Sequence, residues 1–178
     1  DLRRIEDVDG AALTYAEVDR LSRDFAAYLQ QHCGLAKGDR IAIMLPNVLQ
    51  YPVAIAAAFR AGLIIVNTNP MYTPRELQHQ LHDSGARAIL ILENFAHTLA
   101  EVQHDVHLDT VIVTGVGDLL AFPKSLLVNF VLRHVKKQVP EYSLPGAVSL
   151  TEALSKGRYE NLERVELEHE DIAFLQYT

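Results

Sequence analysis

The chain has 178 residues, of which 49% are hydrophobic and 22% charged, as in globular domains that bury a sizeable core. Its net charge of −7 argues against general nucleic-acid binding, and its single cysteine, Cys33, excludes an internal disulfide or a zinc site of several cysteines. With this one cysteine, a reducing, cytoplasmic setting fits best. No apolar run approaches the roughly 18–20 residues of a membrane-spanning helix.

The first predicted element is a helix that begins after Thr14. Thr14 is a suitable N-cap, and Glu17 stands three residues later, which is the spacing of a capping box. Gly34 is available to end the helix. The apolar face that this helix would bury consists of Val18, Leu21, Phe25 and Leu29.

Five short apolar runs follow along the chain and predict strands, at residues 40–45, 63–67, 87–92, 110–114 and 172–177. The runs are continuous rather than alternating, which is typical of strands covered on both faces. Helical patterns at about 48–61 and 73–83 separate the first three runs. This alternation predicts an α/β fold with a parallel, doubly wound sheet.

Several polar groups invite a chemical interpretation, but the pattern favours a structural one. The pairs His79–His82 and His104–His107 each lie one helical turn apart, yet neither has a flanking cysteine or a metal-binding motif. The stretch 114–118 contains a lone Gly-x-Gly, which predicts a plain turn. No complete phosphate-binding loop is present, and no metal site is expected. The acidic stretch 160–171 predicts a solvated connection.

The segment 123–139 predicts a basic amphipathic helix. Apolar residues recur on one side, while Asn129, Arg133, Lys136 and Lys137 gather on the other. Two interpretations stay open. The segment is an ordinary domain helix with a core face, or it lies on an anionic membrane surface with Arg133, Lys136 and Lys137 near the lipid phosphates.

Three stretches together identify a family. They are LTYAEVDRLSRDFAAYL at 13–29, GDRIAIMLPN at 38–47 and FRAGLIIVNTNPMYTPRELQHQLHDSGARAIL at 59–90. In order and spacing they resemble the opening of adenylate-forming acyl-activating enzymes, and more narrowly of bacterial long-chain fatty-acid–CoA ligases. Asn67 stands where the wider superfamily commonly has proline. The resemblance extends from Leu13 to Thr178.

The resemblance implies an ATP-dependent ligase that converts long-chain fatty acids to acyl-adenylates and then to coenzyme A thioesters, with Mg²⁺ bound to the ATP. In this family, a strand similar to FLQYT leads into a Gly/Ser/Thr-rich loop that holds the ATP phosphates. Thr178 matches the first threonine of that loop. The catalytic residues of the family lie beyond position 178.

We therefore expect residues 1–178 to form part of a single N-terminal AMP-binding-type domain that stops before the phosphate-binding loop. By itself this segment should be inactive, and it should self-associate through its unpaired sheet edge. Two alternatives stay open: a non-catalytic membrane-surface module that uses the helix at 123–139, and a flavodoxin-like binding domain that shares only the architecture.

Overall fold

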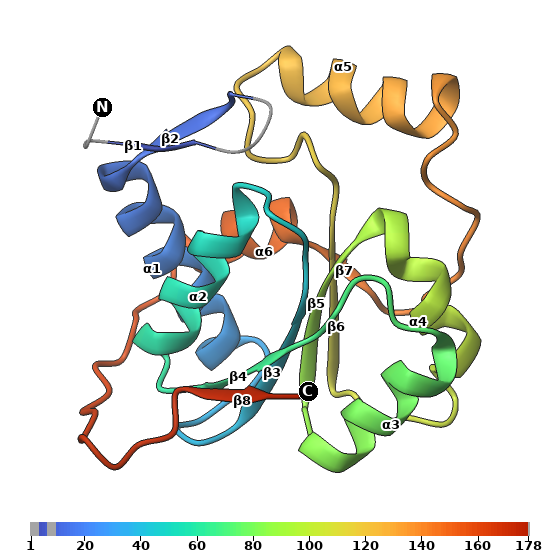
Figure 1. Ribbon diagram of the computed structural model, residues 1–178. Helices are drawn as coiled ribbons and strands as arrows, with labels where there is room; N and C mark the ends of the chain where they lie inside the picture. Colours follow the sequence, from blue (N-terminus) through green and yellow to red (C-terminus); the bar gives the residue numbers. More distant parts are fainter. Residues whose placement is uncertain (1–3, 7–9, 178) are drawn as a thin grey trace.

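The computed structural model describes residues 4–6 and 10–177, and its centre is a six-stranded sheet (Figure 1). The strands lie in the order β7-β6-β5-β3-β4-β8, and each neighbouring pair is parallel. Their bounds are β3 (Arg40–Met44), β4 (Ile64–Asn67), β5 (Ala88–Leu92), β6 (Thr110–Thr114), β7 (Val148–Ser149) and β8 (Phe174–Gln176). All five predicted strands are present, but the expected cover on both faces is wrong for β8, an edge strand in which Phe174 is 40% exposed. The two-residue β7 is too short to produce a recognisable apolar run.

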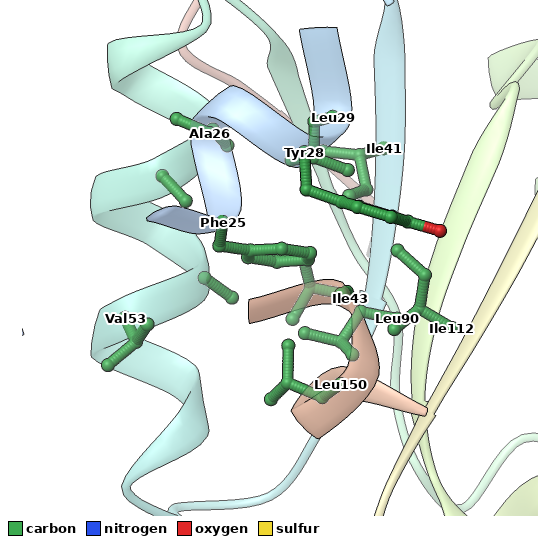
Figure 2. Packing of buried hydrophobic residues seen from close by; sticks show 14 of the residues in the cluster. Phe25, Ala26, Tyr28, Leu29, Ile41, Ile43, Val53, Leu90, Ile112 and Leu150 are labelled. Atoms are coloured by element: carbon green, nitrogen blue, oxygen red, sulfur yellow. The ribbon is translucent and has the colours of Figure 1, made fainter. Parts of the chain in front are cut away.

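Helices cover both faces of the sheet, which confirms the doubly wound arrangement. One face packs against α1 (Tyr15–Gln31), α2 (Gln50–Arg60) and α6 (Leu150–Gly157), and the other against α3 (Pro74–Ser84) and α4 (Ala96–Val102), which follows the short helix η1 (Glu93–Phe95). Figure 2 shows Phe25 and Leu150 packed between the helices and the strand residues Ile43 and Leu90. All four of these side chains are buried.

The helix ends are fixed by the residues that the sequence marks. At α1, the Glu17 N–H donates to Thr14 Oγ1 at 3.2 Å and the Thr14 N–H donates to Glu17 Oε2 at 2.8 Å. Thr73 and Glu76 make the same reciprocal pair at α3. After α1, Gly34 adopts a left-handed φ of 62°, and the Leu35 N–H donates to the Leu29 carbonyl at 3.1 Å. The predicted capping box at Thr14 is confirmed, and α3 has a second one.

Two features differ from the simplest expectation. A short antiparallel hairpin of β1 (Arg4–Glu6) and β2 (Ala12–Thr14) precedes α1. The acidic connection before β8 is exposed, as predicted, but its backbone is also held by α1 side chains. The Arg23 Nη2 donates to the Glu160 carbonyl at 2.7 Å, and the Gln30 amide exchanges two hydrogen bonds with the Glu163 backbone, of 3.1 and 3.0 Å.

The helix expected at 123–139 is shorter, and neither of its faces is fully buried. It comprises α5 (Lys124–Phe130) and a π-helical turn, η2 (Val131–Val135), and it ends where Lys137 takes a φ of 50°. Asn129 and Arg133 face the domain, because a buried carboxylate and a loop N–H there need partners. The apolar side chains that remain exposed are Leu126, Leu127, Phe130 and Val135. Within the described residues, no helix combines the length and apolar character needed to cross a membrane.

Candidate functional site at the carboxyl edge of the sheet

A crevice opens where two neighbouring strands send the chain to opposite faces of the sheet. From β3 the chain continues to α2, and from β4 it continues to α3, so the carboxyl ends of β3 and β4 form a topological switch point. Such points are where open α/β sheets bind ligands. A cavity of about 520 Å³ lies there. Its polar lining consists of the side chains of Asn47, Tyr51, Asn67, Thr68, Asn69, Tyr72, Gln176 and Tyr177.

Asn67, the last residue of β4, connects three elements around this crevice. Its Oδ1 accepts a hydrogen bond from the Tyr51 hydroxyl of α2 at 2.9 Å, and its Nδ2 donates to Gln176 Oε1 of β8 at 2.9 Å. Its backbone carbonyl accepts from Gln80 Nε2 of α3, also at 2.9 Å. Asn67 and Gln176 are register partners in the sheet. The side-chain bond therefore joins the carboxyl ends of two adjacent parallel strands.

Tyr177, the last described residue of the chain, is bonded to α3 through its side chain. Its hydroxyl donates to Asp83 Oδ2 at 2.6 Å. Desolvation, followed by the hydrogen bond and negative charge of Asp83, raises the pKa of Tyr177 to about 12. The phenol is therefore neutral at physiological pH and acts as a donor. Thr178, the predicted start of the phosphate-binding loop, lies outside the described residues.

The lining of the crevice suits a polar ligand but carries no compensating charge for phosphates. Amide and hydroxyl groups provide both donors and acceptors, and no lysine or arginine is among the residues that line the cavity. A nucleotide at this edge would find hydrogen-bonding side chains at the end of β4, on β8, on α2 and on the loops after β3 and β4. The cations that neutralise its phosphates would have to come from elsewhere in the protein.

A second polar cluster lies at the carboxyl end of β6, beneath α5. Asp118 Oδ2 accepts from the Gly115 N–H at 2.8 Å, and its Oδ1 accepts from Asn129 Nδ2 at 2.8 Å. Asn129 Oδ1 in turn accepts from the Gly117 N–H at 2.8 Å. The Gly-x-Gly of residues 115–117 is thus a turn, as predicted, whose N–H groups are satisfied by side chains.

The buried carboxylate of Glu93 anchors the other end of this helix. The side chain of Glu93 is only 4% exposed, and its Oε2 pairs with Arg133 Nη2. This hydrogen bond and the charge of Glu93 raise the pKa of Arg133. Glu93 Oε1 has no protein partner and lies beside a cavity of about 900 Å³ that Leu126, Leu127 and Phe130 also line. Of the three predicted membrane-facing cations, Arg133 therefore pairs with a carboxylate of the domain, although 52% of its side chain is exposed. Lys136 and Lys137 are exposed.

The histidine pairs do not form a cluster of ligands. His82 Nε2 contacts the Asp105 carbonyl oxygen, which gives this side chain a structural partner. Among the described residues, no group of three or more His, Cys, Asp or Glu side chains is arranged to hold a metal ion.

Sequence reasoning missed the bridging role of Asn67. A signal was present, because Asn67 is a polar residue that closes the apolar run at 63–67. The carboxyl end of a parallel strand is where such a side chain meets a ligand or a neighbouring strand. Its partners Tyr51 and Gln176 lie 16 and 109 residues away in the chain, so their identity emerges only from the fold.

Comparisons with known proteins place this chain in a family. The model of the AMP-binding enzyme family matches residues 2–178. A long-chain-fatty-acid–CoA ligase of Escherichia coli O157:H7 is 54% identical over 169 residues, which are 95% of this chain and 30% of the relative. The corresponding ligase of Haemophilus influenzae is also 54% identical, with the same coverage. The chain therefore spans under a third of the length of these relatives.

A solved structure supports the fold independently. The long-chain-fatty-acid–CoA ligase of Archaeoglobus fulgidus superimposes with a TM-score of 0.70 at 22% identity, over 98% of this chain and 29% of the other. At that identity the likeness shows the shared architecture. Together with the family match along nearly the whole chain, it establishes that the chain belongs to the AMP-binding enzyme family and is homologous to the N-terminal part of bacterial long-chain-fatty-acid–CoA ligases.

Proposed function

We propose that the protein containing this chain is an AMP-forming ligase that joins long-chain fatty acids to coenzyme A. The observation that carries the proposal is the 54% identity to long-chain-fatty-acid–CoA ligases along 95% of the chain. The position of the crevice agrees with it, because a polar switch-point cavity stands at the end of β8, where the proposed phosphate-binding loop begins with Thr178.

The reaction has two steps. The fatty-acid carboxylate attacks the α-phosphorus of ATP, which forms acyl-adenylate and releases pyrophosphate. The thiol of coenzyme A, losing its proton, then attacks the acyl carbon and AMP leaves with the bonding electrons. Adenylation is needed because a carboxylate is a poor acyl donor. Mg²⁺ would accompany ATP and offset its charge, as it does in other nucleotide-dependent enzymes.

Within this scheme, residues 1–178 supply the N-terminal part of the large domain and orient the loop that would hold the phosphates. The described crevice contributes amides and hydroxyls, and no cation lines it. The segment alone should therefore be inactive. The whole protein would act in the cytoplasm on long-chain fatty acids, ATP and coenzyme A.

Fatty-acid-dependent exchange between ATP and labelled pyrophosphate tests the proposal, because exchange requires only the first step. The intact protein should exchange with palmitate and with oleate, while the 178-residue segment should not. Absence of exchange by the intact, folded protein with every long-chain acid would contradict the proposed function. Exchange by the segment alone would contradict its assignment as an inactive part.

A second proposed role, attachment to an anionic membrane surface, rests on the exposed apolar face of α5. Phe122, Leu126 and Leu127 are 80%, 64% and 62% exposed. Lys124, Lys136 and Lys137 are exposed near the ends of the same segment. Apolar side chains flanked by lysines suit the boundary between acyl chains and anionic headgroups. The proposed attachment is peripheral, on the cytoplasmic face of the membrane. It is compatible with the catalytic role of the protein.

Flotation of the intact protein with vesicles that contain an anionic phospholipid tests this second role. The double variant Lys136→Glu/Lys137→Glu should float less, and Arg75→Glu/Arg164→Glu, which changes the net charge equally elsewhere, should float like the unmodified protein. Equal flotation of all three would refute the electrostatic contribution. A protein that does not float at all would refute membrane attachment through this face.

A further inference from the structure

From the contacts of Asn67 we infer that this residue is a positioning residue for nucleotide binding, because it fixes the carboxyl end of β8 from which the proposed phosphate loop departs. The inference rests on the proposed function and extends it to a residue of this chain. Asn67 is the residue around the crevice whose single side-chain amide touches both α2 and β8.

A side-chain hydrogen bond at its last residue, Gln176, holds β8 to the rest of the fold. The strand is only three residues long, and its pairing with β4 ends at Asn67–Gln176. A strand this short at the sheet edge has few backbone hydrogen bonds to resist fraying. The Asn67 Nδ2 to Gln176 Oε1 bond of 2.9 Å therefore adds a side-chain restraint two residues before Thr178.

Asn67 is in turn held in place by hydrogen bonds to its side-chain oxygen and to its backbone carbonyl. Tyr51, which donates to Asn67 Oδ1 at 2.9 Å, comes from α2 and lines the same cavity. Gln80 Nε2, itself buried, donates to the Asn67 carbonyl at 2.9 Å from the opposite face of the sheet. The restraint on β8 is thus transmitted from helices on both faces. A loop held this way keeps its backbone donors aimed at a bound phosphate, which small displacements would spoil.

Asn67→Ala in the intact protein removes both side-chain bonds. We expect the KM for ATP in pyrophosphate exchange to rise at least about fivefold, while the KM for palmitate changes little. The matched control is Gln30→Ala. Gln30→Ala also removes two hydrogen bonds, which hold the backbone of Glu163 in the connection before β8. These bonds lie at the end of α1 that leads to the start of β3, so they do not restrain the carboxyl end of β8. Its KM for ATP should stay unchanged.

A pair of charge variants separates positioning from general stability. In Gln176→Glu the carboxylate still accepts from Asn67, and in Asn67→Asp the Gln176 amide can rotate to donate. Each single variant therefore keeps the bond between the two side chains, and it should raise the KM for ATP only by the repulsion of one added charge in the crevice. The double variant sets two carboxylates against each other and should raise that KM far more than the two single effects combined. Additive effects in this cycle, or an unchanged KM for ATP in Asn67→Ala, would overturn the inference.

Hydrogen exchange gives a readout that does not depend on activity. The backbone amides of Leu175–Tyr177 should exchange faster in Asn67→Ala than in Gln30→Ala or the unmodified protein. Equal exchange in all three would overturn the restraint itself. If the unmodified protein shows no pyrophosphate exchange while these amides behave as expected, the proposed function fails and the restraint on β8 stands.

Discussion

Replacement of Gly157 by alanine should destabilise the fold, although helix propensity alone predicts the opposite. Gly157 is the last residue of α6, and it is buried where this helix crosses α1. A Cβ at this position would lie 1.9 Å from the Asp24 carbonyl oxygen and 3.0 Å from Tyr28 Cβ. Carbon and carbonyl oxygen normally approach to roughly 3.3 Å. The two helices would therefore have to separate by about 1.4 Å to relieve the overlap.

The magnitude follows from two opposing effects. Alanine in place of glycine stabilises a helix by up to about 1 kcal/mol. Overpacking at a tight contact costs about 1–3 kcal/mol, and the upper end applies because the obstructing atom belongs to the backbone of α1. The net expectation is a loss of about 1–2 kcal/mol in the free energy of unfolding.

Urea unfolding followed by circular dichroism measures this difference. Ser155→Ala is the matched control, since Ser155 lies on the same helix but is exposed, so it gains propensity without a clash. We expect a lower urea midpoint for Gly157→Ala and an equal or higher midpoint for Ser155→Ala. A Gly157→Ala protein as stable as the unmodified one would refute the close approach of α6 and α1.

Three further predictions follow from single contacts. Arg133→Met leaves the carboxylate of Glu93, which is 4% exposed, without its partner, so the free energy of unfolding in urea should fall by about 1–3 kcal/mol. Adding Glu93→Gln to the same chain should restore most of this loss. An unchanged stability of the single variant would contradict the ion pair. The N–H of Thr73 and then its hydroxyl lower the pKa of Glu76, so the stabilisation by this carboxylate is present above its unfolded pKa of about 4.3 and is lost as the pH falls through the lowered folded value. Glu76→Gln should therefore flatten the dependence of melting temperature on pH in that acidic range, and an unaltered profile would argue against the capping bond. Ile172 is 56% exposed beside β8 and should contribute to self-association of the 178-residue segment. Ile172→Lys should therefore lower the sedimentation coefficient of the segment at high protein concentration. Equal sedimentation of the two proteins would exclude this contact.

Local chemistry made most of the fold predictable from the sequence. The apolar runs at 40–45 and 87–92 predict strands covered on both faces, and the structure places them at the centre of the sheet as β3 and β5. Thr14 and Thr73 mark helix starts because a hydroxyl followed three residues later by a glutamate satisfies the first N–H groups of a helix. These signals involve residues within a few positions of one another, so they need no tertiary information.

The orientation of α5 and the content of the crevice were decided by tertiary structure. Amphipathicity shows that a helix has two faces, but not which of them meets the domain. In α5 and η2 the polar side chains of Asn129 and Arg133 contact the domain because Asp118 and Glu93, two carboxylates that follow other strands, pair with them. Likewise, the sequence shows Asn67 only as the polar end of a strand. Its partner Gln176 is 109 residues further along the chain, and the parallel sheet brings the two side by side. The sequence by itself determined the elements and their caps, because those depend on neighbours in the chain. The polar contacts that build the candidate site depend on partners that only the folded sheet brings together.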